Sequence, residues 1–188
     1  MSLTEPIRCR KQVRLFIAYY RSLGQIRNYV LATLCIHTAL RISDILSISC
    51  DGVYDFENNR VRETFTITEK KTKKSKTIAL NKSVITALEA YLPSAVPGSP
   101  LILNNQTGKA ISRIQAYRII RAAAETLNFS QRVSCHSLRK TFGYHAWKDG
   151  VSPAVIMEIY NHSSFAVTRR YLGVSQDDKN GVYLGMVF

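Results

Sequence analysis

The sequence lacks the patterns that mark several common protein classes. Its four cysteines are scattered, and none of them forms a Cys-x-x-Cys pair, so neither a zinc ribbon nor the disulfide framework of a secreted protein is indicated. No apolar run is long enough to cross a bilayer, and no N-terminal stretch has the pattern of a signal peptide. We therefore expect a cytoplasmic protein without a membrane partner.

Acidic residues are also scarce. The 188-residue chain has 13 Asp and Glu against 26 Lys and Arg, which gives a formal net charge of +13. This excess favours a polyanionic partner such as double-stranded DNA, although a generally basic surface would give the same composition. No group of Asp, Glu and His has the spacing expected of a two-metal nuclease, so we expect neither a metal nor another cofactor.

The chain has enough apolar residues, 46%, for one well-packed domain. Apolar residues recur with helical spacing in five segments: 5–23, 25–40, 81–91, 112–127 and 136–150, and Ser152-Pro153 starts a further helix. Strand-like runs rich in β-branched residues cover 53–56, 61–68 and 76–80. We predict an α+β fold, mainly helical with a small antiparallel sheet, in which residues 1–188 form a single domain.

One stretch near the C-terminus has a pattern with chemical meaning. His136 and Arg139 are three residues apart, so on a helix they share a face and both reach one anionic group such as a phosphate. His162 stands before another expected helix, and Tyr171 follows it by nine residues. The pattern therefore predicts a phenol beside a phosphate-binding site.

This arrangement resembles the catalytic motif of the tyrosine recombinases, the phage integrase family, which cut and rejoin DNA through a phosphotyrosine bond. His136-x-x-Arg139 is similar to the family's His-x-x-Arg box, and Tyr-Asn-His-Ser-Ser at 160–164 is similar to its Leu-Gly-His-Ser-Ser. Asn161 replaces a glycine there, and we expect the turn to survive because Asn tolerates a left-handed backbone.

A second segment extends the resemblance toward the N-terminus. Residues 38–46, Thr-Ala-Leu-Arg-Ile-Ser-Asp-Ile-Leu, resemble the family's Thr-Gly-Leu-Arg-Ile-Ser-Glu-Leu-Leu. Arg41 matches the first catalytic arginine of the family, and Asp44 matches an acid that supports the site. Ala39 replaces a glycine, a change that is conservative in size. The resemblance as a whole covers about residues 13–171.

The resemblance implies six catalytic residues: Arg41, Lys71, His136, Arg139, His162 and Tyr171. The two arginines would neutralise charge that builds on the phosphate, where their forked donors suit an anion better than lysine does. Tyr171 would attack the phosphorus, with His136 or His162 as the base. Lys71, in a lysine-rich hairpin, would protonate the leaving 5′ oxygen. Lys70 and Lys73 remain alternatives for this role, because the alignment of the hairpin can slip.

Other basic residues are expected to contact DNA. They are the hairpin residues Lys70, Lys73, Lys74 and Lys76 and the outward-facing Arg113, Arg118 and Arg121 of the helix at 112–127. A solvated charged loop and an ordinary basic helix surface would show the same residues.

The sequence therefore predicts a site-specific DNA recombinase with a 3′-phosphotyrosyl intermediate at Tyr171. A DNA-binding regulator that has lost strand transfer and a topoisomerase-like relaxing enzyme are the alternatives. From the resemblance we expect this chain to lack the family's usual N-terminal domain, as either a naturally short recombinase or an excised catalytic domain would. The apolar end at 182–188 is expected to dock near the Tyr171 helix, within its own chain or on a neighbouring protomer, so we expect protomers to assemble on DNA.

Overall fold

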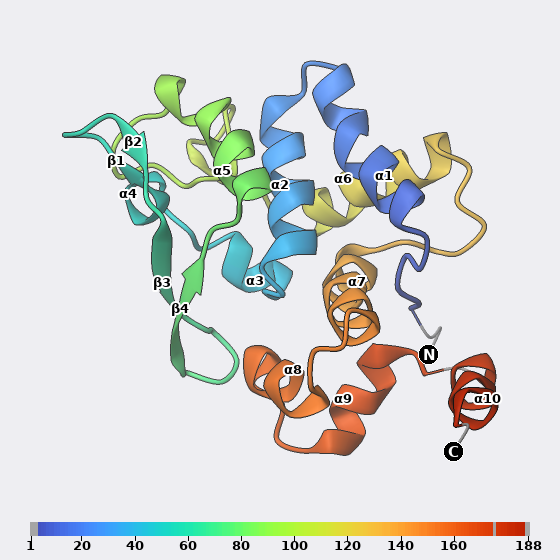
Figure 1. The fold of residues 1–188 in the computed structure, drawn as a ribbon. Coiled ribbons are helices and arrows are strands. Elements are labelled where there is room, and N and C mark those ends of the chain that lie inside the picture. The colour runs from blue at the N-terminus through green and yellow to red at the C-terminus, as the bar shows by residue number, and fades with distance from the viewer. Residues whose placement is uncertain (1–3, 175, 187–188) are drawn as a thin grey trace.

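Helices dominate the computed structural model, which describes residues 4–174 and 176–186 (Figure 1). The helices are α1 (Arg10–Ser22), α2 (Ile26–His37), α3 (Ile42–Ile45), α4 (Cys50–Val53), α5 (Lys82–Glu89), α6 (Arg113–Thr126), α7 (Cys135–Lys148), α8 (Pro153–Tyr160), α9 (Phe165–Leu172) and α10 (Gln176–Gly185). Among these described residues, none of the helices combines the length and the apolar character needed to cross a membrane. The predicted fold class, mainly helical with small antiparallel pairs of strands, is confirmed.

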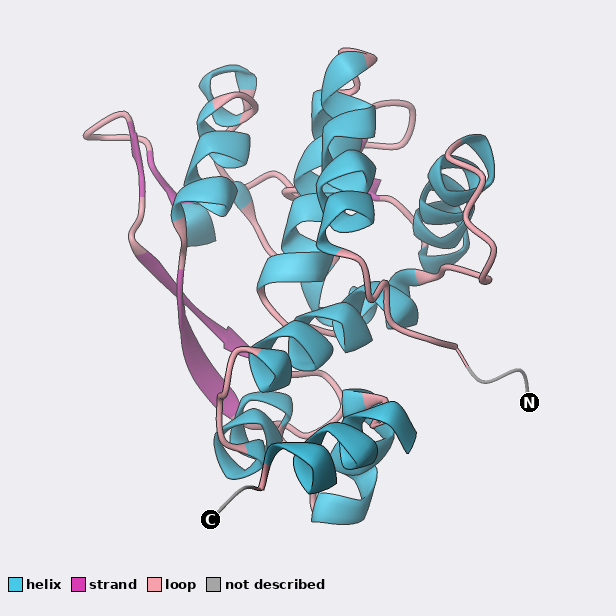
Figure 2. Ribbon diagram, turned by 45° about the vertical axis from the view of Figure 1, so that its right-hand side comes forward, coloured by secondary structure: helices cyan, strands magenta, loops and turns pink. Residues whose placement is uncertain are grey.

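The strands pair as separate two-stranded ladders within the described residues. They are β1 (Tyr54–Asp55) with β2 (Arg60–Val61), β3 (Thr64–Thr68) with β4 (Ser75–Ala79), and β5 (Leu103–Asn104) with β6 (Lys109–Ala110), and every pair is antiparallel. Residues 53–80 form two separate ladders instead of one sheet, because the pairing of β1 with β2 reaches only Val61 and that of β3 with β4 begins at Thr64. The long β3–β4 hairpin extends downward beside the helices (Figure 2).

The main core forms around α2. Nine consecutive residues of this helix, 28–36, are buried, which is expected of a helix that is apolar on all sides. It packs between α1, α5 and α7 (Figure 1). The helix ends at His37, short of the predicted residue 40, because Ala39 has a left-handed backbone with φ of +55°. This reversal directs Arg41 out of the helical core.

A second, smaller apolar cluster supports α8 and α9. Its buried members are Ala39, Ile156, Tyr160 and Leu172. Helix α7 lies between this cluster and the main core, as Figure 1 shows. Residues carried by the core and by the two C-terminal helices therefore meet along α7.

The N-terminal segment is extended before α1 begins at Arg10, so the helix predicted from residue 5 starts later. Three contacts hold this segment on α7. The amide of Ile7 donates to Thr141 Oγ1 over 2.9 Å, Lys140 Nζ donates to Thr4 O over 2.6 Å, and His145 Nε2 lies 3.0 Å from Ile7 O. These contacts with α7 satisfy backbone groups of the segment that a helix would otherwise have paired.

Candidate active site

Arg41 occupies the junction between α2 and α3. It is the N-cap residue of α3 and has an extended backbone, which follows directly from the reversal at Ala39. Its side chain is 22% exposed, and Nη1 donates to Glu69 Oε2 over 2.9 Å. One edge of the guanidinium is thus fixed by a carboxylate.

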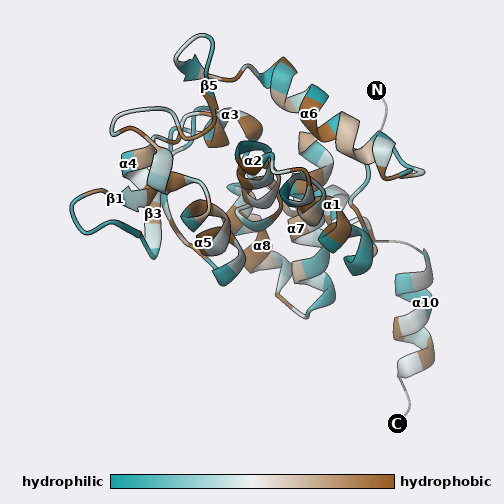
Figure 3. Cartoon of the chain, turned by 90° about the horizontal axis from the view of Figure 1, so that it is seen from above, coloured by the Kyte–Doolittle hydropathy of each residue, from teal (hydrophilic) through white to brown (hydrophobic). Residues whose placement is uncertain are grey.

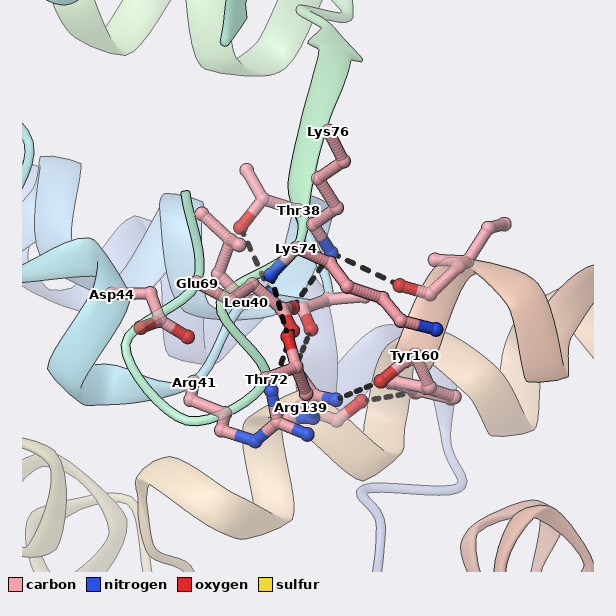
Figure 4. Close-up of polar contacts among 12 residues, drawn as sticks. Thr38, Leu40, Arg41, Asp44, Glu69, Thr72, Lys74, Lys76, Arg139 and Tyr160 are labelled. Atoms are coloured by element: carbon pink, nitrogen blue, oxygen red, sulfur yellow. Dashed lines mark hydrogen bonds and ion pairs between the residues drawn. The ribbon is translucent and has the colours of Figure 1, made fainter. Parts of the chain in front are cut away.

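Arg139 lies close to Arg41, in the second turn of α7, and is only 1% exposed (Figure 4). Its Nη1 donates to the carbonyl of Ala39, and Nη2 donates to the carbonyl of Tyr160 over 3.1 Å. The guanidinium carbon also lies 4.6 Å from the centre of the Tyr160 ring. Burial lowers the pKa of Arg139, but a guanidinium remains charged in proteins. Arg139 therefore provides a fixed positive charge that joins α7 to the Ala39 turn and to the end of α8.

The turn after α8 brings His162 into the same site. Asn161 has a left-handed backbone with φ of +52°, as predicted from its resemblance to a glycine position. The His162 ring then stacks on Tyr160 with centroids 5.0 Å apart, and its Nδ1 lies 3.0 Å from Thr168 Oγ1. The Nδ1 contact orients the ring and leaves Nε2 for other partners.

Tyr171 lies between the two histidines. Its ring centroid is 5.1 Å from that of His136 and 4.7 Å from that of His162. Tyr171 is half-buried on α9, and Lys140 Nζ lies 5.5 Å from its ring centroid. The structure therefore brings together the phenol and both imidazoles that the sequence placed in separate motifs.

Both histidines are neutral at physiological pH in this arrangement. The pKa of His136 is lowered to about 4 because desolvation and the positive charges of Lys140, Arg139 and Arg41 disfavour its protonated form. The pKa of His162 is also lowered to about 4, mainly by desolvation and then by Arg139 and Arg41. A neutral imidazole is the form that accepts a proton.

The hairpin loop completes the site. Lys71 lines a cavity of about 300 Å³ together with Arg41, His136, Arg139 and Tyr171. Lys70 instead lines a neighbouring cavity with Arg41 and Arg113. Of the lysines that the sequence left open for the catalytic position, Lys71 is the one that shares a cavity with Tyr171 among the described residues.

Lys76 does not have the surface position expected of a DNA contact. Its side chain is 16% exposed, and Nζ donates to Ile159 O over 3.0 Å and lies 3.2 Å from Glu69 Oε1. The alternation of β4 turns this lysine inward, toward the end of α8. Sequence reasoning also missed Glu69, although an acid directly before four closely spaced lysines was a visible signal.

The other tyrosines near the motif have different environments. Tyr160 is fully buried, its hydroxyl donates to Arg139 O over 2.6 Å and accepts from the amide of Gly143 over 2.8 Å, and burial raises its pKa. Tyr183 lies on α10 with 79% of its surface exposed. Of these three tyrosines, only Tyr171 combines access to the cavity with two adjacent bases.

A profile of the phage integrase family matches residues 9–177, most of the chain and the whole of this site. The chain belongs to the phage integrase family. This membership, together with relatives named integrase/recombinase and tyrosine recombinase, supports site-specific DNA recombination by a tyrosine-type enzyme.

Curated relatives of this integrase agree with the assignment. It is 36% identical over 183 residues to the probable integrase/recombinase YoeC of Bacillus subtilis (strain 168), and the match covers 97% of both chains. It is 27% identical over 165 residues to the tyrosine recombinase XerD of Corynebacterium glutamicum. That match covers 85% of the integrase and 52% of XerD, so the chain spans about half the length of this relative.

Solved structures share the fold. The integrase superposes on the XerA recombinase with a TM-score of 0.78 at 19% identity, covering 97% of this chain and 66% of XerA. Its TM-score to the XerH recombinase bound to difH DNA in a post-cleavage complex is 0.73 at 17% identity, covering 97% of this chain and 53% of XerH. The mainly helical architecture is thus that of tyrosine recombinase catalytic domains.

Tyr160, which stands where the family has leucine, requires Gly143 on α7. A Cβ added at Gly143 would lie 2.5 Å from Tyr160 Oη and 2.8 Å from Cε2. The phenol cannot retreat without losing its two backbone hydrogen bonds, so we expect Gly143→Ala to lower the free energy of unfolding by about 1–3 kcal/mol. Denaturant unfolding followed by circular dichroism measures this change.

Gly181→Ala is the matched control, because a Cβ at this position of α10 meets nothing within 4 Å. We expect it to leave stability unchanged or to raise it by up to about 1 kcal/mol, as alanine favours a helix over glycine. Equal unfolding midpoints for Gly143→Ala and the unaltered protein would contradict the packing of Tyr160 described above.

Proposed function

We propose that this integrase breaks DNA by attack of Tyr171 Oη on a backbone phosphorus. The new bond joins Tyr171 to the 3′ phosphate, the bond to the 5′ oxygen breaks, and a free 5′ hydroxyl leaves. The observation that carries the proposal is the position of Tyr171 beside two neutral imidazoles, in a cavity that Arg41, Lys71 and Arg139 also line.

In this proposal Arg41 and Arg139 stabilise the negative charge on the phosphate oxygens. Attack on a phosphodiester increases charge on its non-bridging oxygens, and fixed cations in a partly dry site lower the cost of that charge. Arg139 Nε has no partner among the described residues, and Arg41 uses one edge for Glu69. Donors on both guanidinium groups are therefore free for a phosphate.

Two proton transfers complete the step. The phenol proton passes to His136 or His162, whose rings lie beside that of Tyr171 and are neutral in this arrangement. Lys71 donates a proton to the 5′ oxygen, which would otherwise leave as a poor alkoxide. Rejoining is the reverse reaction, in which a 5′ hydroxyl from the same or another strand displaces Tyr171.

The phosphotyrosyl bond keeps the energy of the broken phosphodiester, so the reaction needs neither nucleotide nor metal. We expect the protein, mixed with nicked duplex DNA carrying the host's inverted repeats, to form a covalent adduct at full yield in EDTA. Adduct formation is measured by the shift on a denaturing gel. Loss of cleavage in EDTA with recovery in magnesium would contradict the proposal and indicate metal-dependent chemistry.

The same experiment separates the predicted alternatives. A regulator that only binds DNA would form no adduct, and a topoisomerase-like enzyme would relax supercoiled DNA without joining strands from two duplexes. The convergence of all six predicted residues near the Tyr171 cavity supports the recombinase over the regulator. Since its substrate is chromosomal or phage DNA, we also propose a cytoplasmic location.

We propose that basic residues around the cavity hold the DNA backbone. Lys70 and Arg113 line the cavity next to the active site, and Lys73, Lys74 and Arg118 are exposed on the hairpin loop and on α6. Arg121 is half-buried and pairs with Glu125 over 2.7 Å, so its contribution is smaller. Contacts of this kind fix the position of a protein on DNA without reading its sequence.

Helix α10 supports assembly of protomers on DNA. It projects from the body of its own chain (Figure 3), and Val182, Tyr183, Leu184 and Met186 are each more than 60% exposed. Val187 and Phe188, which the sequence analysis included in this apolar end, lie outside the described residues. Because a patch of apolar side chains left in water is unfavourable, we propose that the end of α10 docks on a neighbouring protomer.

Deletion of residues 181–188 tests this proposal. We expect the truncated protein to keep its unfolding midpoint but to lose higher-order complexes on DNA in native gels, and to form the Tyr171 adduct at an altered rate. Lys179→Gln, a polar change on the same helix, is the control and should assemble normally. If the truncated protein assembles and cleaves like the full chain, α10 has no docking role.

A further inference from the structure

Glu69 has an unusual environment for a carboxylate in a basic protein. It follows β3 directly, its side chain is 0% exposed, and Oε2 accepts both Arg41 Nη1 over 2.9 Å and Thr72 Oγ1 over 2.7 Å. Oε1 forms an ion pair with Lys76 Nζ at 3.2 Å. Figure 4 shows these side chains converging on the carboxylate between the hairpin and α7.

The Glu69 carboxylate is charged. Burial alone would raise its pKa, but the hydrogen bond from Thr72, the nearby amide of Asn161 and the charges of Lys76 and Arg41 outweigh burial and lower the pKa to about 2. A buried anion with this many donors is costly to move, because any displacement leaves charged partners unpaired.

These contacts join separate parts of the active site. Arg41 comes from the α2–α3 junction and Thr72 from the hairpin loop. Lys76 adds a connection to the C-terminal helices, since its Nζ also donates to Ile159 O near the end of α8. The Glu69–Lys76 pair therefore fastens the hairpin to the C-terminal helices.

Lys71 lies between two anchored neighbours. On one side, the amide of Lys70 donates to Asp44 Oδ1 over 2.9 Å, and on the other side Thr72 donates to Glu69. Both carboxylates are completely buried, whereas Lys71 itself is exposed toward the cavity that it shares with Tyr171. The loop is thus fixed at both sides of its proposed general acid.

We propose that Glu69 is a positioning residue that, with Lys76, clamps the β3–β4 hairpin onto α8 and thereby holds Lys71 in reach of the leaving 5′ oxygen. This inference rests on the function proposed above. Glu69 touches neither substrate nor leaving group, and it acts through the backbone position of Lys71.

The test compares two leaving groups on the nicked duplex carrying the host's inverted repeats. One DNA has the natural 5′ oxygen at the cleavage site, and the other has sulfur there, which departs without needing a proton from a general acid. We expect Glu69→Gln to slow adduct formation on the oxygen substrate about a hundredfold, the scale of a misplaced catalytic group. On the sulfur substrate we expect a loss of less than tenfold, while DNA affinity stays unchanged on both.

Two variants complete the design. Glu63→Gln changes an exposed acid just before β3 and should behave as the unaltered protein on both substrates. The double variant Glu69→Gln/Lys76→Met removes both ends of the Glu69–Lys76 ion pair, so the buried Lys76 ammonium is not left unpaired, and it should repeat the selective loss.

Two results would contradict the positioning role of Glu69 and leave the recombinase proposal intact. One is an unchanged rate of adduct formation in the folded double variant. The other is an equal loss of rate on the oxygen and sulfur substrates. Absence of any adduct with the unaltered protein on both substrates would instead contradict the proposed function itself, and the clamp with it.

Discussion

Replacing Tyr171 with Phe should abolish covalent attachment to DNA completely, while binding and folding remain. The change removes one hydroxyl and keeps the ring in contact with His136, His162 and Tyr160. We therefore expect the free energy of unfolding to change by no more than about 1 kcal/mol, the scale of a single hydrogen bond. The measurement is the yield of protein–DNA adduct on nicked duplex, alongside DNA affinity in a filter-binding assay.

Tyr183→Phe is the matched control for this experiment. Tyr183 is exposed on α10, and Tyr183→Phe keeps the ring proposed to dock while removing only the hydroxyl, so the adduct yield should be unchanged. Tyr160→Phe is not a suitable control, because it would remove the two hydrogen bonds of the buried Tyr160 hydroxyl, from the amide of Gly143 and to the carbonyl of Arg139. An adduct that persists at full yield in Tyr171→Phe would refute the assignment of the nucleophile.

Arg139→Lys should be nearly as damaging as Arg139→Ala, with a loss of about a hundredfold or more in the rate of adduct formation. Arg139 uses two nitrogens to hold the carbonyls of Ala39 and Tyr160, and only a forked guanidinium keeps a further donor for the phosphate. An ammonium at this buried position would satisfy fewer of these partners. Single-turnover rates on the nicked duplex measure the effect.

An arginine-to-lysine substitution at the surface is the control for the effect of Arg139→Lys. Arg60→Lys changes an arginine whose side chain is 74% exposed in the short β1–β2 hairpin, and it should leave the rate within about twofold, as expected of surface substitutions. If Arg139→Lys retained the rate of the unaltered protein, positive charge alone would suffice, and the argument from the forked donors would be wrong.

The sequence by itself determined the fold class and placed four of the proposed catalytic residues in local motifs. The spacing of His136, Arg139, His162 and Tyr171 depends on local helix and turn geometry, which short-range chemistry controls. The left-handed turn at Asn161 and the capping of α6 by Ser112 and of α8 by Ser152 are equally local, and the structure has each of them. Local rules therefore sufficed wherever a residue's partner lay within one helical turn.

Only the tertiary structure decided features that depend on contacts distant in the chain. The sequence analysis treated Ala39 as a conservative replacement for glycine. In the fold it adopts a left-handed backbone, which costs an L-residue about 1–2 kcal/mol. Its buried methyl group packs with Tyr160 and Ile156. From the sequence, Lys76 was predicted to be one more DNA-contacting lysine of the hairpin. In the fold its amine lies between Glu69 and Ile159. Composition and spacing say nothing about such pairings.

Lys71 lines the Tyr171 cavity, whereas Lys76 is buried against Glu69. Strand alternation and the loop length set which face of the hairpin each lysine occupies. The position of the hairpin on the helices depends in addition on contacts of the buried Glu69 carboxylate. Glu69 meets Arg41 28 residues earlier in the chain, and Lys76 meets Ile159 83 residues later. Chain folding, and no local preference, brings these charges together, because a buried anion is stable only where cations from distant segments surround it.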